Sequence, residues 1–361
     1  MCGICGKISL KGEIVDKELI VQMCLVLSHR GPDDEGVYLG RNIGLGHRRL
    51  SIIDLISGHQ PLSNEDGTIW IVYNGEIYNF PELKAQLLSR GHQFTTLSDT
   101  EVIVHAYEEY GFPCVSKFNG MFAFAIWDKR KKMLFIARDR LGIKPLYYYL
   151  DSEKFIFASE IKGILADSSV PRKINYNGLN NFFTFCHSVA PDTIYSGIKK
   201  LLPGHFLVYQ DGKIKTEEYW DIPERTENGS YSIASEEECA NEVYRLLQTS
   251  VQRQLISDVP LGVFLSGGID SGTIVGLMNQ VVSKPVKTFS VGFEIGGAYN
   301  ELADAAIVAK RFKTEHHELI VKETNLVELL NKLVYHYDEP FGDAACFPTY
   351  LISEFARKSV K

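Results

Sequence analysis

Two long apolar runs in the first half of the chain constrain its fold most strongly. Residues 121–127 read Met-Phe-Ala-Phe-Ala-Ile-Trp and residues 133–137 read Met-Leu-Phe-Ile-Ala, with the charged stretch 129–132 between them. A strand with one wet face alternates apolar and polar residues, so runs this continuous indicate strands that are covered on both faces. We therefore predict a hairpin inside a four-layer αββα sandwich, in which helices cover two packed sheets.

The pattern changes to alternating strands and helices after a polar stretch rich in Thr, Glu, Asn, Gly and Ser. Strand–helix alternation is typical of a parallel, doubly wound α/β sheet that binds its ligand at the carboxyl ends of the strands. A chain of 361 residues is long enough for two such domains. We expect a first domain at 2–214, a linker at 215–235 and a second domain at 236–361.

Composition narrows the class of protein. Hydrophobic residues make up 45% and charged residues 23%, as in ordinary globular domains, and a net charge of −7 argues against a dedicated nucleic-acid binder. No stretch approaches the roughly 18 apolar residues of a membrane-spanning helix, and no signal peptide is evident, so we expect a cytoplasmic protein. Seven scattered cysteines do not form a disulfide framework.

The first residues, Met1-Cys2-Gly3-Ile4-Cys5-Gly6, contain a candidate nucleophile. The small side chain of Cys2 permits removal of Met1, which would leave a free α-amine with a pKa of about 7.7–8.0 beside the thiol. That amine can accept the thiol proton directly or through a water. The pair Cys2 and Cys5 also has the spacing of half a zinc site or of a redox pair, but no second Cys pair or spaced His pair completes a metal shell, so we expect no zinc at this motif.

Three short motifs follow that could bind a substrate or stabilise its reaction, each with a structural alternative. Arg49 could bind a carboxylate through its planar guanidinium, or be a surface arginine beside a strand. Asn74-Gly75 is the strongest tight-turn pair, yet the same amide and N–H can form an oxyanion hole. Ser-Asp-Thr-Glu at 98–101 has capping-box spacing, and Asp99 is either structural or holds a substrate ammonium.

A glycine-rich loop, Ser-Gly-Gly-Ile-Asp-Ser-Gly at 266–272, joins an expected strand to an expected helix. Backbone N–H groups and the helix dipole at such a loop favour phosphate, and Asp270 could hold Mg²⁺. The loop lacks the Walker and dinucleotide spacings, and an ordinary strand-to-helix turn is the alternative. Further on, Asp338 and Asp343 either accompany the end of a helix or line the nucleotide cleft.

In this order, the motifs resemble those of the glutamine-hydrolysing asparagine synthetases, along the whole chain. Other matching segments are His-Arg-Gly-Pro-Asp from residue 29, Gly-Met-Phe-Ala-Phe-Ala from 120, Arg-Asp-Arg-Leu-Gly from 138 and Pro-Gly-His from 203. The resemblance implies an N-terminal-nucleophile glutaminase domain, an ATP-pyrophosphatase-type synthetase domain, and a homodimer formed through the first domain.

The resemblance also implies roles for particular residues. Cys2 would attack the glutamine amide, Asn74 and Gly75 would hold the oxyanion, and ammonia would pass through an interior channel to an aspartyl-adenylate made from aspartate and ATP. The implied glutamine-binding residues are Arg49, Leu50, Ser51, Ile52, Ile53, Asn74, Gly75, Glu76 and Asp99. The implied ATP-binding residues are Phe264, Leu265, Ser266, Gly267, Gly268, Asp270, Ser271 and Val291, with Mg²⁺ at Asp270.

Members of that family extend beyond the position of Lys361. We therefore expect a truncated chain with an intact glutaminase site, little amide synthesis and an incomplete second sheet with an exposed edge. Three other functions remain open: an amidotransferase acting on a sugar, peptide or antibiotic precursor, an uncoupled amidase with a vestigial second domain, and a non-catalytic dimer-forming scaffold.

Overall fold

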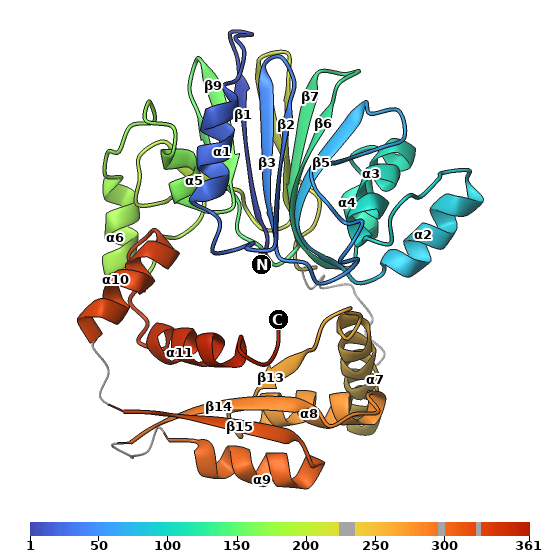
Figure 1. The fold of residues 1–361 in the computed structure, drawn as a ribbon, viewed down its shortest axis with the longest axis vertical. Helices are drawn as coiled ribbons and strands as arrows, with labels where there is room; N and C mark the ends of the chain where they lie inside the picture. The colour runs from blue at the N-terminus through green and yellow to red at the C-terminus, as the bar shows by residue number, and fades with distance from the viewer. Residues whose placement is uncertain (224–234, 295–299, 323–325) are drawn as a thin grey trace. The chain divides into compact units, whose positions relative to one another are not determined.

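The computed structural model describes residues 1–223, 235–294, 300–322 and 326–361, apart from the side chain of Leu326. The chain divides into two compact units, each described separately below (Figure 1). The first unit comprises Met1–Pro223 with Asp338–Gly342, and the second comprises Glu224–Tyr337 with Asp343–Lys361. In the described part of the chain, no helix has the length and apolar character needed to span a bilayer.

The first unit contains two six-stranded sheets in which neighbouring strands are antiparallel. The first sheet has the order β10-β8-β9-β1-β3-β2, with β1 Gly3–Ser9, β2 Asp34–Leu39, β3 Ile43–Arg49, β8 Tyr147–Leu150, β9 Lys154–Ala158 and β10 Ile198–Lys200. The second has the order β12-β11-β7-β6-β5-β4, with β4 Leu62–Ser63, β5 Ile69–Ile77, β6 Gly120–Asp128, β7 Met133–Arg138, β11 His205–Gln210 and β12 Lys213–Glu218.

Helices cover the outer faces of the two sheets (Figure 1). Helices α1 and α5 pack on the first sheet, α3 packs on β5 of the second, and α2 and α4 pack on α3. The bounds of the helices in this unit are α1 Lys17–Leu25, α2 Phe80–Ser89, α3 Asp99–Tyr110, α4 Cys114–Lys117, α5 Ile161–Leu165 and α6 Tyr176–Phe185.

Strand β6 shows why the apolar runs lead to this layering. Ala123, Ala125 and Trp127 lie in the core between the two sheets, whereas Phe122 and Phe124 lie in the core beneath the helices of the second sheet. Since successive side chains of a strand point to opposite faces, β6 is buried on both. The predicted αββα sandwich is confirmed.

The last strand of the first unit and the start of α3 each show a detail that the sequence pattern did not provide. Strand β12 pairs with β11 up to Glu218, four residues beyond 214, because the hairpin at 211–212 continues as a regular ladder. Helix α3 begins at Asp99, with Ser98 as N-cap accepting from the N–H of Thr100. The reciprocal half of the predicted capping box is absent, because the Glu101 carboxylate instead accepts from the backbone of the preceding loop. Most of the expected linker, residues 224–234, lies outside the described residues.

The second unit contains a parallel sheet in the order β13-β14-β15, as its alternating pattern predicts. Helices α8 and α9 lie on one face of this sheet and α11 lies on the other, against Phe289 of β14 (Figure 1). The bounds are α7 Glu236–Gln254, β13 Gly262–Phe264, α8 Ile269–Val281, β14 Lys287–Phe293, α9 Leu302–Phe312, β15 Glu315–Val321, α10 Leu326–Tyr337 and α11 Cys346–Ala356.

Candidate active site

Cys2 lies immediately before β1, next to the end of β3. The antiparallel register pairs Gly3 with Arg48, and this brings the Cys2 Sγ atom to 3.4 Å from the backbone N of Leu50. Burial raises the pKa of the Cys2 thiol, although the Leu50 N–H and the N-terminal amino group act in the opposite direction. Met1 is 54% exposed. Because its pKa is raised, the thiol needs a base to react. Met1, which blocks the α-nitrogen of Cys2, is accessible for removal.

Arg30 anchors the backbone of Cys2. Its Nε donates to the Cys2 carbonyl at 2.8 Å, and its Nη1 donates to Glu160 at 2.8 Å. Glu160 also pairs with His29 and Lys162. Burial alone would raise the pKa of Glu160, but these three partners outweigh it and lower the pKa to about 2. Sequence reasoning gave Glu160 no role, because its partner Arg30 is 130 positions away.

Gly31 explains why this turn needs a glycine. A Cβ atom at this position would lie 2.3 Å from the carbonyl carbon and oxygen of Arg48, which are backbone atoms that cannot swing aside. The Arg48 side chain in turn donates to the Gly31 carbonyl at 3.0 Å. This close approach joins the turn that carries Arg30 to strand β3.

A small pocket opens beside the Cys2 thiol. The candidate residues that line it are Cys2, Arg49, Leu50, Ile52, Ile53, Gly75, Glu76 and Asp99. Ser51 and Asn74 are not among the lining residues; the Ser51 N–H donates to Asp33 instead. Four further residues line the pocket that sequence reasoning had not assigned to a ligand site, namely Gln60, Tyr73, Ser98 and Thr100.

Arg49 is buried at the wall of this pocket. Its Nη2 donates to the carbonyl of Ile53 at 3.0 Å and to that of Asp54 at 2.5 Å, so the loop after β3 folds around the guanidinium. Gly58 lies against the same group, since a Cβ there would be 2.1 Å from Nη2. Within the described residues, Nε and Nη1 make no hydrogen bond to protein, which leaves cationic donors for a ligand anion. The alternative of a surface arginine is wrong.

Two carboxyl groups, Glu76 and Asp99, line the same pocket. Asp99 accepts from the Tyr73 hydroxyl at 2.8 Å and from the Ile77 N–H at 2.9 Å. Burial raises the pKa of both groups, and the charge of Asp99 raises that of Glu76 further. Two buried carboxyl groups with raised pKa values favour a bound cation, which would stabilise both in their charged form.

Lys144 is a second cation near this pocket. Burial lowers its pKa, whereas Glu76 and Cys2 act to raise it. Its backbone N–H donates to Asp139, which holds the turn after β7 in place. Sequence reasoning gave Lys144 no function, because its nearness to Glu76 depends on the packing of the two sheets.

Asn74 and Gly75 lie inside β5, opposite Ala123 and Phe122 of β6, so the tight-turn alternative is wrong. The Asn74 side chain is buried, and neither its amide nitrogen nor its oxygen has a hydrogen-bond partner among the described residues. Alternation along β5 puts this amide on the same face as Val72, which lies in the core between the sheets. A Cβ at Gly75 would lie 2.2 Å from the Met121 carbonyl oxygen. An unpaired buried amide thus neighbours two pocket-lining residues.

In the second unit, the loop 266–268 leads directly into α8. Gly267 has φ +82° and a Cβ there would lie 2.6 Å from Asp304 Cβ, so only glycine fits. The Ser266 and Ser271 hydroxyls are 3.1 Å apart, and the Gly268 N–H donates to Ser266 Oγ. Helix α8 has no side-chain cap. The loop therefore presents small polar groups beside an uncapped helix N-terminus.

The remaining candidates of the nucleotide site surround that loop. Asp270 is exposed in the first turn of α8, and Phe264 and Val291 lie on neighbouring strands of the parallel sheet. The Leu265 carbonyl accepts from the Ser290 hydroxyl at 2.5 Å.

The two later aspartates have other partners. Asp338 pairs with Lys162 in the first unit at 3.0 Å. Asp343 accepts from the Ala345 N–H at 2.8 Å, before α11.

An αββα sandwich that holds a cysteine at the start of its first strand, beside a polar pocket, has the architecture of the N-terminal-nucleophile glutamine amidotransferases. The family model described as "Glutamine amidotransferase domain" matches residues 1–220, and the one described as "Asparagine synthase" matches residues 242–361.

Curated relatives give the same assignment. A putative glutamine-hydrolysing asparagine synthetase 2 of Methanocaldococcus jannaschii is 43% identical, over 100% of this chain and 72% of that protein. Asparagine synthetase 1 of Bacillus subtilis is 39% identical over 100% of this chain and 56% of its own length. The amidase chry2 of Gibberella zeae is 33% identical over 95% of this chain and 54% of its own length. The chain belongs to the glutamine-hydrolysing asparagine synthetase family and spans between about half and three quarters of the length of these relatives.

Proposed function

We propose that the first unit hydrolyses glutamine to glutamate and ammonia, with Cys2 as the nucleophile. After removal of Met1, the α-amine of Cys2 takes the thiol proton, and the thiolate forms a C–S bond with the side-chain carbonyl carbon of glutamine. The C–N bond then breaks, and the α-amine returns the proton to the departing ammonia. Water hydrolyses the thioester and releases glutamate.

The observation that carries this proposal is the grouping of charges complementary to an amino acid around one thiol. Arg49 supplies a cation for the glutamine carboxylate, and Glu76 and Asp99 supply carboxylates for its ammonium. The side chain of a ligand held at these two points would extend towards Cys2. An amino-acid substrate requires both a cation for its carboxylate and a carboxylate for its ammonium. A simple amide substrate would require neither.

The oxyanion that forms during attack needs donors as well. We assign this role to the Asn74 side-chain amide and the Gly75 N–H, since the Asn74 amide is buried and meets no hydrogen-bond partner in the described part of the chain. An unpaired buried amide costs stability, and a donor aimed at developing charge lowers the barrier of the reaction. Removal of such a donor lowers kcat by about 10²- to 10³-fold in comparable sites.

For the whole protein we propose glutamine-dependent asparagine synthesis, in the cytoplasm and as a homodimer. Ammonia from the first unit reacts with aspartate that has been activated by ATP, giving asparagine, AMP and pyrophosphate. The names of the M. jannaschii and B. subtilis relatives support aspartate as acceptor.

The loop after β13 suits a phosphate group. Backbone N–H groups at the start of α8 and the hydroxyls of Ser266 and Ser271 could hold phosphate oxygens, and Asp270 has the donor chemistry for Mg²⁺. Magnesium there would neutralise phosphate charge. The backbone at Phe264, the last residue of β13, at Leu265 directly after it, and at Val291 on β14 would then lie against the adenine.

Hydrolysis of glutamine by the purified chain tests the proposal. We expect glutamate release that disappears in Cys2→Ala, because no other residue supplies the thiol and α-amine together. The matched control is Cys239→Ser, an exposed cysteine on α7, which should keep full activity. Glutamate release by a folded Cys2→Ala variant at the rate of the parent would overturn the assignment. For the full-length protein, incubation with ATP and aspartate should yield asparagine, and a different amide product would identify another acceptor.

A further inference from the structure

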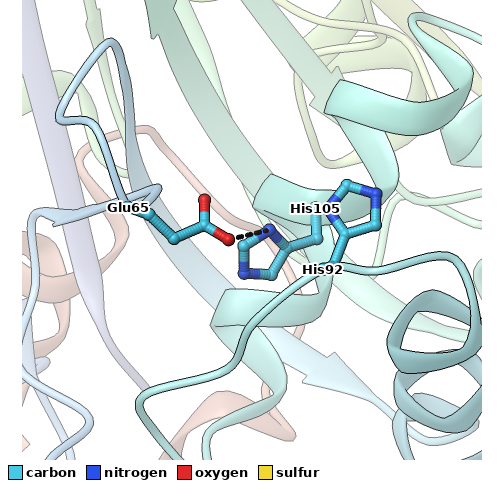
Figure 2. Close-up of side chains that lie close together, drawn as sticks. All are labelled: Glu65, His92 and His105. Atoms are coloured by element: carbon cyan, nitrogen blue, oxygen red, sulfur yellow. Dashed lines mark ion pairs between the residues drawn. The ribbon is translucent and has the colours of Figure 1, made fainter.

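A second group of ligand-type side chains lies on the helical side of the first unit. Glu65 follows β4, His92 follows α2, and His105 and Glu108 lie on α3. One ligand atom from each of Glu65, His92 and His105 lies within 4.8 Å of the others. Figure 2 shows Glu65 and His105 turned towards each other, with the His92 ring beside that of His105. Neither the family resemblance nor the proposed glutaminase chemistry uses these residues.

The separations in this group suit a tetrahedral metal. His105 Nδ1 lies 3.0 Å from Glu108 Oε2 and 3.9 Å from Glu65 Oε1, and His92 Nδ1 lies 3.9 Å from the same Glu108 oxygen. Four ligands at zinc bond lengths of about 2.0–2.1 Å have edges of about 3.3–3.4 Å. The three separations bracket that value, so small side-chain rotations would bring the donors to bonding distance.

Each histidine has a carboxylate on the side of its other nitrogen. His105 Nε2 lies 3.7 Å from Glu101 Oε1, and His92 Nε2 lies 3.4 Å from Glu109 Oε2. Glu101 is itself fixed by the N–H groups of Thr95 and Thr96. A carboxylate that hydrogen-bonds a histidine fixes the ring and its tautomer, and Glu109 has this contact with His92. His105 Nε2 is buried without a hydrogen-bond partner among the described residues, and the Nδ1 of that ring faces Glu108.

The two glutamates are held as well. Asn64 Nδ2 donates to Glu108 Oε1 at 2.7 Å, which leaves Glu108 Oε2 turned towards His105. Glu65 accepts from the Gln93 N–H at 3.2 Å. His105 is 1% exposed, whereas the Glu65 side chain is 42% exposed. The group thus has a buried floor and one open side through which an ion could enter.

We propose that His92, His105, Glu65 and Glu108 form a binding site for a divalent transition metal of the zinc type. Two imidazoles and two carboxylates are N and O donors that suit Zn²⁺, and also Co²⁺, Ni²⁺ and Cu²⁺. The ligands come from three separate segments, so the ion would tie the turn after β4 and the loop after α2 to α3. The site is structural, since His105 lies six positions along α3 from Asp99 in the pocket.

Titration with Co²⁺ and with Zn²⁺ tests this proposal. The Cys2→Ala form is used, so that the thiol of the active site does not bind the metal. We expect one ion per chain, visible d–d absorption of tetrahedral Co²⁺ without a sulfur charge-transfer band, and a higher melting temperature with Zn²⁺. Glu65→Gln and His92→Gln should each weaken binding by about 10-fold or more, since loss of even an outer-shell partner of a ligand costs about 10- to 100-fold in metal affinity.

The controls are matched in chemistry and position. Asp66→Asn changes the next carboxylate on the same turn, and His59→Gln removes a histidine that pairs with Asp34 elsewhere in this unit. Both should bind metal like the parent. Glu65→Gln alters a half-exposed turn and keeps the test valid even if His92→Gln fails to fold. If the folded chain binds no stoichiometric metal, the group is an ion-paired histidine cluster and the proposal is overturned. Binding that neither substitution weakens would also overturn it, because the ion would then lie at another site.

Discussion

Replacement of Arg49 by lysine tests whether this arginine holds the substrate carboxylate. The Arg49 Nη2 atom already donates to two backbone carbonyls, of Ile53 and Asp54, so only Nε and Nη1 remain for a ligand. Lysine keeps the positive charge, but its single ammonium would have to satisfy those carbonyls and the ligand at once. Arg49→Lys therefore loses hydrogen bonds to a charged ligand and keeps the buried charge.

The magnitude follows from the value of such bonds. A hydrogen bond to a charged group contributes about 1.5–3 kcal/mol, and about 1.4 kcal/mol corresponds to a factor of ten. Loss of one bond should raise KM for glutamine by about 10- to 150-fold. Because the contact is the same in the ground state and the transition state, kcat should change by no more than a few-fold.

The assay is the initial rate of glutamate release against glutamine concentration. Arg48→Lys is the control, because Arg48 precedes Arg49 on β3 and its side chain contacts the Gly31 carbonyl and Glu35 instead of the pocket. Its KM should match that of the parent. A KM for Arg49→Lys within about two-fold of the parent would refute carboxylate recognition by Arg49, since even the weakest such bond exceeds that factor.

Three other substitutions probe the same unit. Asn74→Ala should lower kcat by about 10²- to 10³-fold with little change in KM and no loss of melting temperature, because its amide has no hydrogen-bond partner to lose within the described residues; an unchanged kcat would contradict the oxyanion role. Glu76→Gln should weaken glutamine binding and raise the melting temperature. Burial and the charge of Asp99 raise the pKa of Glu76 above 4.5, so the parent loses folding stability as pH rises above that value. The stability that Glu76→Gln gains over the parent should therefore vanish in acid. Burial lowers the pKa of His47 from 6.5 to about 3, so the parent loses stability as pH falls from 6.5 towards 3. The unfolding free energy of His47→Gln, measured with denaturant, should change less with pH over that interval than that of the parent. If the two curves of free energy against pH run parallel, His47 is not the cause of the loss.

The elements that could be predicted from sequence are those with a local pattern. The continuous apolar run of β6 indicated burial on both faces, and the alternating pattern of the second half indicated the parallel sheet. Propensity misleads where packing overrides it. Asn74-Gly75 is a strong turn pair, but a long ladder with β6 keeps it extended.

The parts of the site that sequence could not supply depend on residues far apart in the chain. Glu160 reaches Arg30, and Lys144 approaches Glu76, only once the sheets have formed and packed. The capping-box spacing also predicted a local bond for Glu101, whereas in the folded chain this carboxylate binds the loop before α3. Spacing alone does not show which of several donors a carboxylate will reach.

Mass spectrometry of the chain after reaction with an alkylating glutamine analogue tests the central claim most directly. If a thiol beside its own free amine cleaves glutamine, the active protein lacks Met1 and carries a single label on Cys2. Fully active protein that retains Met1, or that is labelled at another residue, would contradict this account.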